Sequence, residues 1–373
     1  MRRSLKRIWA LSAKEVRHVL RDPRSLYLAL GMPVVLLLLF GYGVSFDLEN
    51  MPIAFVDLDQ SASSREMRQR IGASGDFVDT GVIGIEEAET RLIAGQVIAV
   101  VVFERGFERH LRRGELATVQ LLVDGSDNNG AAQTRAKIEA MGRVFGFALA
   151  AGDAAGGAPP IETRTWTRFN PEGRSAVFLV PGIAAYVLAI VAVLLTALTI
   201  AREWENGSMA QLFATPVGRL EIVLGKLLPY LALGTLAVLL VLAVGMWVFN
   251  VPFRGSPLAL ALLSFLFISG MLGQGLFISV LTRNQMVATQ VATLSSMLPS
   301  MLLSGFVFPI ENMPMVLQKV TLVIPARYYV EGLRGVLLRG NGMEQLWPQI
   351  LALAAFTVVM VTLSTARFRR TIA

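Results

Sequence analysis

The sequence AVFLVPGIAAYVLAIVAVLLTALTI (residues 176–200) is a run of 25 residues without a single charge. About 20 apolar residues are enough to cross the hydrocarbon core of a bilayer as an α-helix. A helix buried in a soluble protein is usually shorter or carries charges on one side. This stretch therefore predicts a membrane-spanning helix.

Five further stretches have the same character and a similar length. The full set comprises residues 25–46, 176–200, 227–249, 257–281, 286–310 and 346–366. Only 16% of the chain is charged and 54% is hydrophobic, whereas about a quarter of a soluble domain is charged. We therefore predict an α-helical polytopic membrane protein with six transmembrane helices.

The distribution of basic residues predicts the orientation in the membrane. Residues 1–24 hold eight Lys or Arg and two acids, and the chain end adds Arg367, Arg369 and Arg370. The positive-inside rule places both termini in the cytoplasm, here of a bacterial inner (plasma) membrane. The net charge of +7 is then explained by topology and by attraction to anionic lipid. We expect no binding of nucleic acid.

The first 24 residues differ from a cleaved export signal because charges interrupt their apolar residues. Apolar residues within 4–22 fall near helical spacing, with basic residues between them. This pattern predicts that residues 1–24 form an amphipathic cytoplasmic interface helix on the inner membrane surface. Pro23 is expected to end it before the span 25–46.

A long polar segment separates the first span from the second. Residues 47–175 contain 14 Lys or Arg and 19 Asp or Glu, a net charge of −5. Short β-branched runs predict strands at residues 52–59, 96–103 and 118–124. Helices are predicted from Ser63, which has Glu66 at capping-box spacing, and at residues 85–95, 104–113 and 130–150. Alternating strands and helices indicate an α/β domain. Because one span separates it from the cytoplasmic N-terminus, we expect this domain to be extracytoplasmic.

Two carboxylates at the end of the first predicted strand, Asp57 and Asp59, allow a hydrolase interpretation. Such a pair can hold a nucleophile and a magnesium ion. The alternative, which we favour, is a polar strand end that caps the following helix. With no cysteine and two histidines in the chain, we expect no metal site.

No segment matches a phosphate-binding loop. The nearest candidate runs from Gly218 to Gly225 and Lys226, but six residues separate its glycines and Leu227 stands where Ser or Thr must reach magnesium. We therefore expect that this chain is not an enzyme and binds no cofactor.

The cytoplasmic loop 201–226, AREWENGSMAQLFATPVGRLEIVLGK, combines a charged cluster with a short helix predicted at 208–214. From the pattern alone, two interpretations stay open. The loop is either a stiff helix along the membrane face that contacts a soluble partner, or a charged loop that closes a hairpin.

Small polar residues form a stripe along the fifth predicted span, at spacings of four, three, four and four residues. The stripe consists of Thr289, Thr293, Ser296, Ser300 and Ser304. Such residues let helices pack closely in lipid, and they also suit the lining of a substrate pathway. The predicted spans contain no ionisable residue in mid-membrane, so proton or sodium coupling lacks its usual carriers.

Between the last two spans, three prolines divide residues 305–345 into short pieces. Arg327 and Glu331, and Glu331 and Arg334, are spaced to form ion pairs on a helix. This segment is either an outer gate or a structural loop. The candidate gate residues are Phe306, Phe308, Glu311, Arg327, Glu331 and Arg334.

Two segments carry a resemblance to a known family. REWENGSMAQLFATPVGRLEIVLGKLLPY (202–230) and GFVFPIENMPMVLQKVTLVIPARYYVEGLRGVLLRG (305–340) resemble the corresponding segments of type-2 ABC transporter permeases. The long insertion is similar to that of the large-insertion subgroup of drug-efflux-like exporters. The resemblance implies a five-helix transmembrane domain at 176–373, with a coupling loop at 201–226 and an outer re-entrant segment at 305–345.

The resemblance also implies a function. Such a permease subunit exports drug-like, lipid or other amphipathic substrates as a homo- or heterodimer, while ATP and magnesium bind a separate ABC ATPase subunit. A periplasmic adaptor protein is a further candidate partner. The residues implied in ATPase coupling are Arg202, Glu203, Glu205, Gly207, Ser208, Gln211, Thr215 and Pro216. The alternative is a membrane receptor or scaffold whose outer domain binds a partner without transport.

Overall fold

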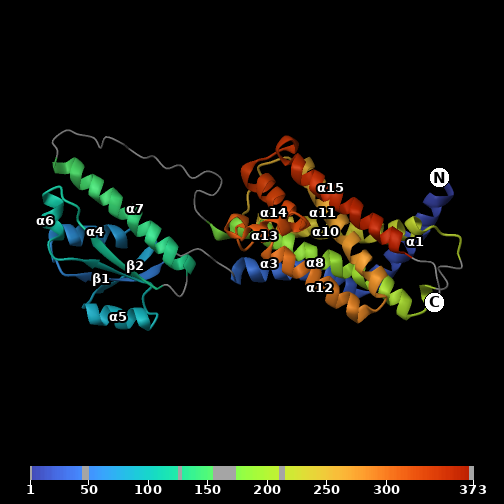
Figure 1. The fold of residues 1–373 in the computed structure, drawn as a ribbon, viewed down its shortest axis with the longest axis horizontal. Helices are drawn as coiled ribbons and strands as arrows, with labels where there is room; N and C mark the ends of the chain where they lie inside the picture. Colours follow the sequence, from blue (N-terminus) through green and yellow to red (C-terminus); the bar gives the residue numbers. More distant parts are fainter. Residues whose placement is uncertain (1, 44–49, 125–127, 154–173, 210–214, 369–373) are drawn as a thin grey trace. The chain divides into compact units, whose positions relative to one another are not determined.

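The computed structural model describes residues 2–43, 50–124, 128–153, 174–209 and 215–368. The chain divides into two compact units (Figure 1): residues 46–166 form one unit, and residues 1–45 and 167–373 form the other. Helices make up most of the described residues.

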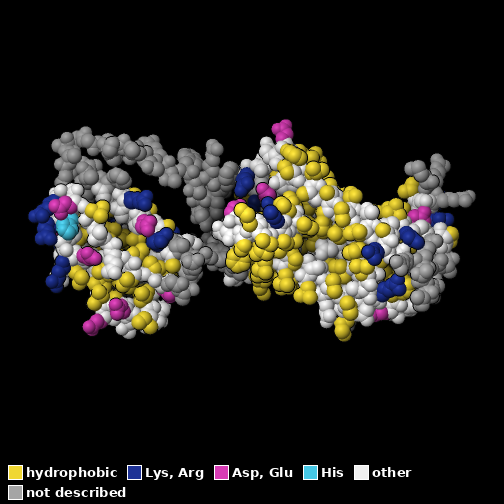
Figure 2. Space-filling view, viewed as in Figure 1, with side chains coloured by type: hydrophobic (Ala, Val, Ile, Leu, Met, Phe, Trp, Pro, Cys, Tyr) yellow, Lys and Arg dark blue, Asp and Glu magenta, His cyan; other side chains and the backbone are white. Residues whose placement is uncertain are grey.

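The unit formed by residues 1–45 and 167–373, here called the helical unit, contains only helices and connecting segments among its described residues. They are α1 (Arg2–Arg21), α2 (Pro23–Leu26), the π-helical turn η1 (Tyr27–Gly31), α3 (Met32–Gly43), α8 (Ser175–Glu205), α10 (Arg219–Trp247), α11 (Pro257–Thr282), α12 (Gln285–Leu302), η2 (Ile310–Asn312), α13 (Met315–Thr321), α14 (Pro325–Arg334), η3 (Gly335–Arg339) and α15 (Met343–Arg367). Within the described residues, α8, α10, α11 and α15 are long and apolar enough to span a membrane, and Tyr27–Gly43 is a shorter apolar helix. Hydrophobic side chains cover much of the visible face of this unit (Figure 2).

Helix α8 forms the centre of the helical unit. It is apolar on all sides, and most of its residues from Ser175 to Ala201 are buried against α3, α10, α11, α12 and α14. A Cβ atom on Gly275 of α11 would lie 2.2 Å from the Val193 carbonyl oxygen. The Thr196 hydroxyl donates to the Leu272 carbonyl at 2.7 Å. Small residues and an interhelical hydrogen bond thus let α8 and α11 approach closely, as in membrane helix pairs generally.

The stretch 286–310 is not one continuous helix, so the predicted extent is wrong at its C-terminal end. Helix α12 ends at Leu302. Gly305 follows with φ +77°, a left-handed conformation that ends helices and that glycine adopts without a steric penalty. Residues 310–339 then fold into η2, α13, α14 and η3.

The other unit, the α/β unit, alternates strands and helices. Its elements are β1 (Met51–Asp57), α4 (Ala62–Gly72), β2 (Phe77–Val82), α5 (Ile85–Ile93), β3 (Ala99–Phe103), α6 (Phe107–Arg112), β4 (Val119–Val123) and α7 (Asn128–Asp153). The sheet order is β2-β1-β3-β4. Strand β1 pairs in parallel with β2 and β3, whereas β3 and β4 are antiparallel. Strand β2 was not predicted, because Asp79 and Gly81 interrupt its apolar pattern.

Helices cover both faces of this sheet. Helices α4 and α7 lie on one face and α5 lies on the other (Figure 1). All five residues of β3 and most of β1 are buried. Strands covered on both faces are expected to be continuous apolar runs, which is why these two strands were evident in the sequence.

Helix α4 is capped by Ser61, so the predicted cap at Ser63 is wrong. The Ser61 hydroxyl accepts the Ser64 amide at 3.1 Å, and the Ser64 hydroxyl accepts the Ser61 amide at 3.1 Å. The Ser64 hydroxyl also donates to the Asp57 carboxylate at 2.8 Å. The strand end therefore positions the cap two residues earlier than Glu66 suggested.

Both carboxylates at this strand end bind backbone amides. Asp57 accepts from the amides of Asp59 and Gln60, and Asp59 accepts from the amides of Gly106 and Glu108, at 2.7 to 3.1 Å. These contacts support the capping interpretation over the hydrolase interpretation.

Candidate coupling site

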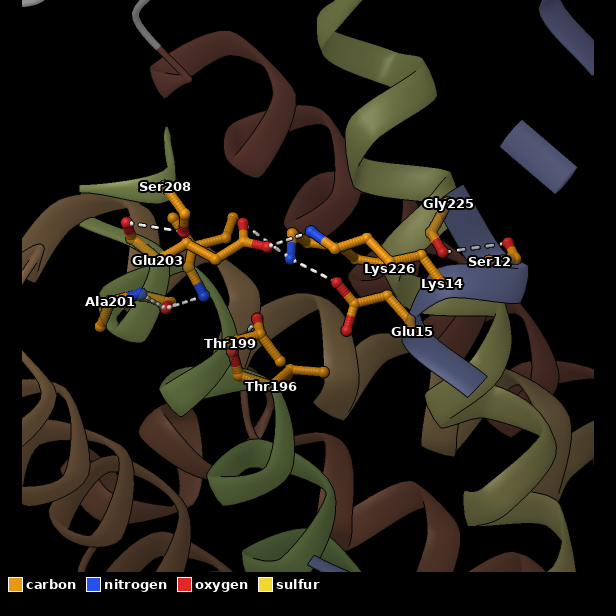
Figure 3. Close-up of polar contacts among 12 residues, drawn as sticks. Ser12, Lys14, Glu15, Thr196, Thr199, Ala201, Glu203, Ser208, Gly225 and Lys226 are labelled. Carbon is orange, nitrogen blue, oxygen red and sulfur yellow. Dashed lines mark hydrogen bonds and ion pairs between the residues drawn. The ribbon is translucent and has the colours of Figure 1, made fainter. Parts of the chain in front are cut away.

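One buried ammonium group joins three helices at one end of the helical unit. Lys226, near the start of α10, has a side chain that is only 4% exposed. Its Nζ atom lies 2.7 Å from Glu15 Oε1 on α1 and 2.9 Å from Glu203 Oε2 on α8 (Figure 3). A buried charge is costly unless it is paired with good geometry. The contacts of Lys226 therefore make α1, α8 and α10 depend on one another.

The approach of α1 to α10 requires a small residue beside Lys226. A Cβ atom on Gly225 would lie 2.8 Å from Leu11 Cβ. The Ser12 hydroxyl donates to the Gly225 carbonyl at 3.0 Å (Figure 3). Arg7 of α1 also lies 3.6 Å from Glu221 of α10. Helix α1 is therefore packed along α10.

The outward face of α1 is apolar. Leu5, Trp9, Val16 and Leu20 are all exposed, and their spacing places them on one side of the helix. Ser12 and Glu15 are buried on the adjacent side of the helix, which packs against α10. Helix α1 thus occupies most of the predicted segment, and Ser12 and Glu15 are its buried polar residues.

Further ion pairs surround Lys226. The exposed Lys14 lies 3.4 Å from Glu203 Oε1, and Arg202 lies 3.6 Å from Asp22. The Ser208 hydroxyl donates to the Glu203 carbonyl at 3.2 Å. A small cleft of about 180 Å³ is lined by charged groups of both signs, namely Lys14, Glu15, Arg202, Glu203 and Lys226.

The end of α8 is also attached to the turn between α11 and α12. Glu205 accepts the Gln285 backbone amide at 2.8 Å and is hydrogen-bonded to its side-chain amide. The Arg283 guanidinium lies 4.4 Å from the centre of the Trp204 ring, a favourable cation–π distance. The last turn of α8 is thus bound on two sides.

The loop that follows α8 begins with a sharp change of direction. Gly207 has φ +69°, and helical structure resumes at Ser208 and Met209, where Met209 is buried. Thr215 and Pro216 are exposed. The predicted coupling residue Gln211 lies outside the described residues.

The structure thus brings together four of the predicted coupling residues, Arg202, Glu203, Glu205 and Ser208, at the end of α8. Their principal partners, Glu15, Lys226 and Gln285, were missed. A signal did exist for two of them: Glu15 is the one acid within the first 21 residues, and Lys226 is the last charge before a long apolar run. Neither signal, however, indicates that Glu15 and Lys226 form an ion pair with each other.

Comparison with known proteins decides the family. A family model described as "ABC-2 family transporter protein" matches residues 24–366. This chain belongs to the ABC-2 family. The ABC-2 chain resembles the probable multidrug ABC transporter permease YbhS of Escherichia coli K12, with 35% identity over 369 residues that cover 98% of each protein.

Two other relatives from the same organism cover nearly the whole ABC-2 chain. The probable multidrug ABC transporter permease YbhR is 28% identical over 98% of each chain, and the inner membrane transport permease YhhJ is 28% identical over 99% of each. The resemblance to ABC permeases is therefore confirmed. The ABC-2 chain is a multi-pass permease subunit and not itself an enzyme.

The predicted polar stripe of the ABC-2 permease lies on the packed side of α12. Ser296, Ser300 and Ser304 are buried, and α12 packs against α8. The hydroxyls of Thr289, Thr293, Ser296 and Ser304 each donate to the carbonyl four residues earlier. This placement suits helix packing, and the substrate pathway stays a prediction.

The candidate gate residues of the ABC-2 permease differ in their surroundings. Phe306 is buried against α8, where a Cβ atom on Gly182 would lie 2.0 Å from its ring and the Tyr186 ring stacks at 6.4 Å. Phe308 and Glu311 are exposed. Phe306 therefore packs against the central helix, whereas Phe308 and Glu311 are open to the surroundings.

The ion pairs predicted on α14 are wrong. Among the described residues, Glu331 pairs with neither Arg327 nor Arg334. Arg327 donates to the Thr321 hydroxyl at 2.5 Å instead. Arg334 donates to the Gly305 carbonyl at 3.0 Å, with its guanidinium 3.9 Å from the centre of the Phe178 ring. Tertiary partners thus replace the local pairs, which are worth only about 0.2–0.5 kcal/mol on a helix.

Proposed function

We propose that this chain is the membrane permease of an ATP-driven exporter. It works with a separate ABC ATPase subunit, which holds ATP and magnesium, and with a second permease chain. The six predicted spans cross an inner membrane with both termini in the cytoplasm, and the α/β unit lies outside. The family match supports the permease role, and the names of the relatives YbhS and YbhR favour a drug-like or amphipathic substrate.

The observation that carries the proposal is the attachment of Lys226 to both Glu15 and Glu203. Glu203 and Lys226 both lie within the loop 201–226 that is expected to contact the ATPase. A displacement of this loop by the ATPase therefore moves α1 and α10 together with α8, because breaking the buried ion pairs would cost several kcal/mol.

Helix α8 connects the ion-pair cluster around Lys226 with the candidate gate at the opposite end of the helix. Its 31 residues correspond to a length of roughly 46 Å at 1.5 Å per residue. Glu203 lies near one end and Gly182, which contacts Phe306, near the other. Since α8 is packed on all sides, a tilt at its coupling end also displaces the candidate gate.

A direct test is purification of the tagged chain from its native membranes into nanodiscs. We expect a P-loop ATPase in stoichiometric amounts, with ATP hydrolysis that it supplies. Gln211→Pro is expected to abolish both while membrane insertion persists, because proline disrupts the predicted short helix. Gln211→Ala is the matched control and retains them.

Two results would contradict the proposal. Retention of the ATPase and of ATP hydrolysis in Gln211→Pro would remove the coupling role of the loop. A chain purified at full yield without an ATPase would favour the alternative receptor or scaffold function. A periplasmic adaptor stays a prediction from the resemblance.

A further inference from the structure

The α/β unit contains an open groove between β4 and α7. Its volume is about 890 Å³, within the range of roughly 300–1,000 Å³ that is usual for small-molecule sites. Leu121 and Val123 of β4 and Ile138 and Phe145 of α7 line it. The groove is therefore mainly apolar, and it opens beside the edge strand of the sheet.

Two glycines on α7 keep this groove wide. Gly142 and Gly146 lie one helical turn apart and both line it. A Cβ atom on Gly142 would meet only the Met67 methyl group, at an ordinary 3.6 Å, and one on Gly146 would meet nothing within 4 Å among the described residues. Glycine is the poorest helix former after proline. Close packing therefore does not require these glycines, and the absence of large side chains here leaves space in the groove.

Charged side chains also line the groove, and they include the carboxylates Glu115 and Glu139 as well as three arginines. The arginines are Arg112, Arg113 and Arg135. Arg112 is paired with Glu108, and Arg135 lies 3.5 Å from Glu139. Arg113 is exposed and forms no ion pair with a carboxylate among the described residues. A ligand with one anionic group would find in Arg113 a guanidinium without a carboxylate partner among the described residues, beside the apolar lining.

We propose that this groove binds a single-chain amphipathic anion, such as a fatty carboxylate. Its alkyl chain lies between β4 and α7, over the space left by Gly142 and Gly146. Its carboxylate contacts Arg113, where a charge-assisted hydrogen bond forms. This inference rests only on the α/β unit and does not depend on the coupling role of Lys226.

The test uses the full chain in phosphatidylcholine nanodiscs. The probe is dodecanoic acid with a terminal diazirine, and the comparison probe is the corresponding alcohol. After irradiation, labelled peptides are mapped by mass spectrometry. We expect the acid to label peptides that contain residues 119–123 and 138–146 about tenfold more than the alcohol does, and unlabelled dodecanoate to compete.

Matched variants separate the two parts of the site. Gly146→Phe fills the groove and is expected to lower labelling of these peptides about tenfold, whereas Gly146→Ala retains it. Arg113→Glu lowers labelling by the acid but not by the alcohol. Arg105→Glu, which changes an exposed arginine outside the groove, changes neither.

Hydrogen exchange of residues 51–57 checks that each variant keeps the sheet folded. The proposal is overturned if labelling is confined to the membrane helices or if acid and alcohol label the groove equally. It is also overturned if Gly146→Phe, with the sheet intact, is labelled as strongly as the unaltered chain.

Discussion

At the residue scale, Lys226 holds two carboxylates that would otherwise face each other. Lys226→Met leaves the buried Glu15 and the partly buried Glu203 without their shared cation. We expect the free energy of unfolding to fall by about 3–5 kcal/mol, the usual cost of breaking a buried ion pair by removing one partner. Thermal unfolding of the purified protein measures the change.

Lys14→Met is the control, because Lys14 is 61% exposed and also pairs with Glu203. An exposed pair contributes at most about 1 kcal/mol. The interpretation of Lys226 as the buried link fails if both variants unfold at the same temperature.

Asp59 gives the α/β unit a dependence on pH. Burial alone would raise the pKa of Asp59, but hydrogen bonds from the Glu108 amide, the Ser61 side chain and the Gly106 amide outweigh it and hold this pKa below its usual value. A carboxyl group with a lowered pKa stabilises the fold at neutral pH, and this contribution is lost as pH falls through the folded-state pKa. Hydrogen-exchange protection of residues 104–112 should therefore decrease in acid.

Asp59→Asn should lower this protection at pH 7 and make it less sensitive to pH. Glu86→Gln changes an exposed carboxylate on α5 and serves as the control. A pH profile of Asp59→Asn that matches that of the unaltered chain would show that other groups set the dependence.

At the scale of elements, α1 depends on a glycine of α10. Gly225→Val places methyl groups where Leu11 now packs, since even a Cβ atom would lie 2.8 Å away. We expect α1 to be displaced and its many lysines and arginines to be cleaved faster by trypsin. The measurement is limited proteolysis of the protein in nanodiscs, with cleavage sites determined by mass spectrometry.

Leu228→Val alters an exposed residue of the same helix and should leave the cleavage rate unchanged. If Gly225→Val is cleaved no faster than this control, contacts other than the Gly225 approach hold α1 in place.

The elements that the sequence predicted well are those with a continuous local pattern. Helix α8 is uncharged over its apolar length, and β1 and β3 are β-branched runs. Strand β2 was missed because Asp79 and Gly81 break its pattern. The early end of α12 was missed because the left-handed conformation of Gly305 leaves no trace in hydropathy.

The candidate site was predictable only in part, for a related reason. The cluster at the end of α8 carries a family resemblance within one continuous segment. Glu15 and Lys226, in contrast, lie 211 residues apart. Spacing rules relate residues within one element, so one sequence cannot pair residues that meet only through the packing of α1 on α10.

At the scale of the whole molecule, the α/β unit has its own core. The fully buried Phe55 and Phe103 stack within it. Residues 46–166 expressed alone should therefore fold and unfold cooperatively, as compact domains of this size generally do. Circular dichroism during heating is the measurement.

Phe103→Ala in the same fragment should lower the free energy of unfolding by about 3–5 kcal/mol. Arg105→Ala, an exposed neighbour, is the control. A fragment that melts gradually, with no transition for Phe103→Ala to shift, would show that the unit folds only within the full chain.

The long sequence separation of Glu15 and Lys226 has a consequence for biosynthesis. A ribosome that adds about 5–20 residues per second needs roughly 10–40 seconds to make the 211 residues between them. During that interval α1 has no α10 to pack against. Its exposed Leu5, Trp9, Val16 and Leu20 form an apolar face through which the nascent helix can bind the membrane surface until α10 has been synthesised.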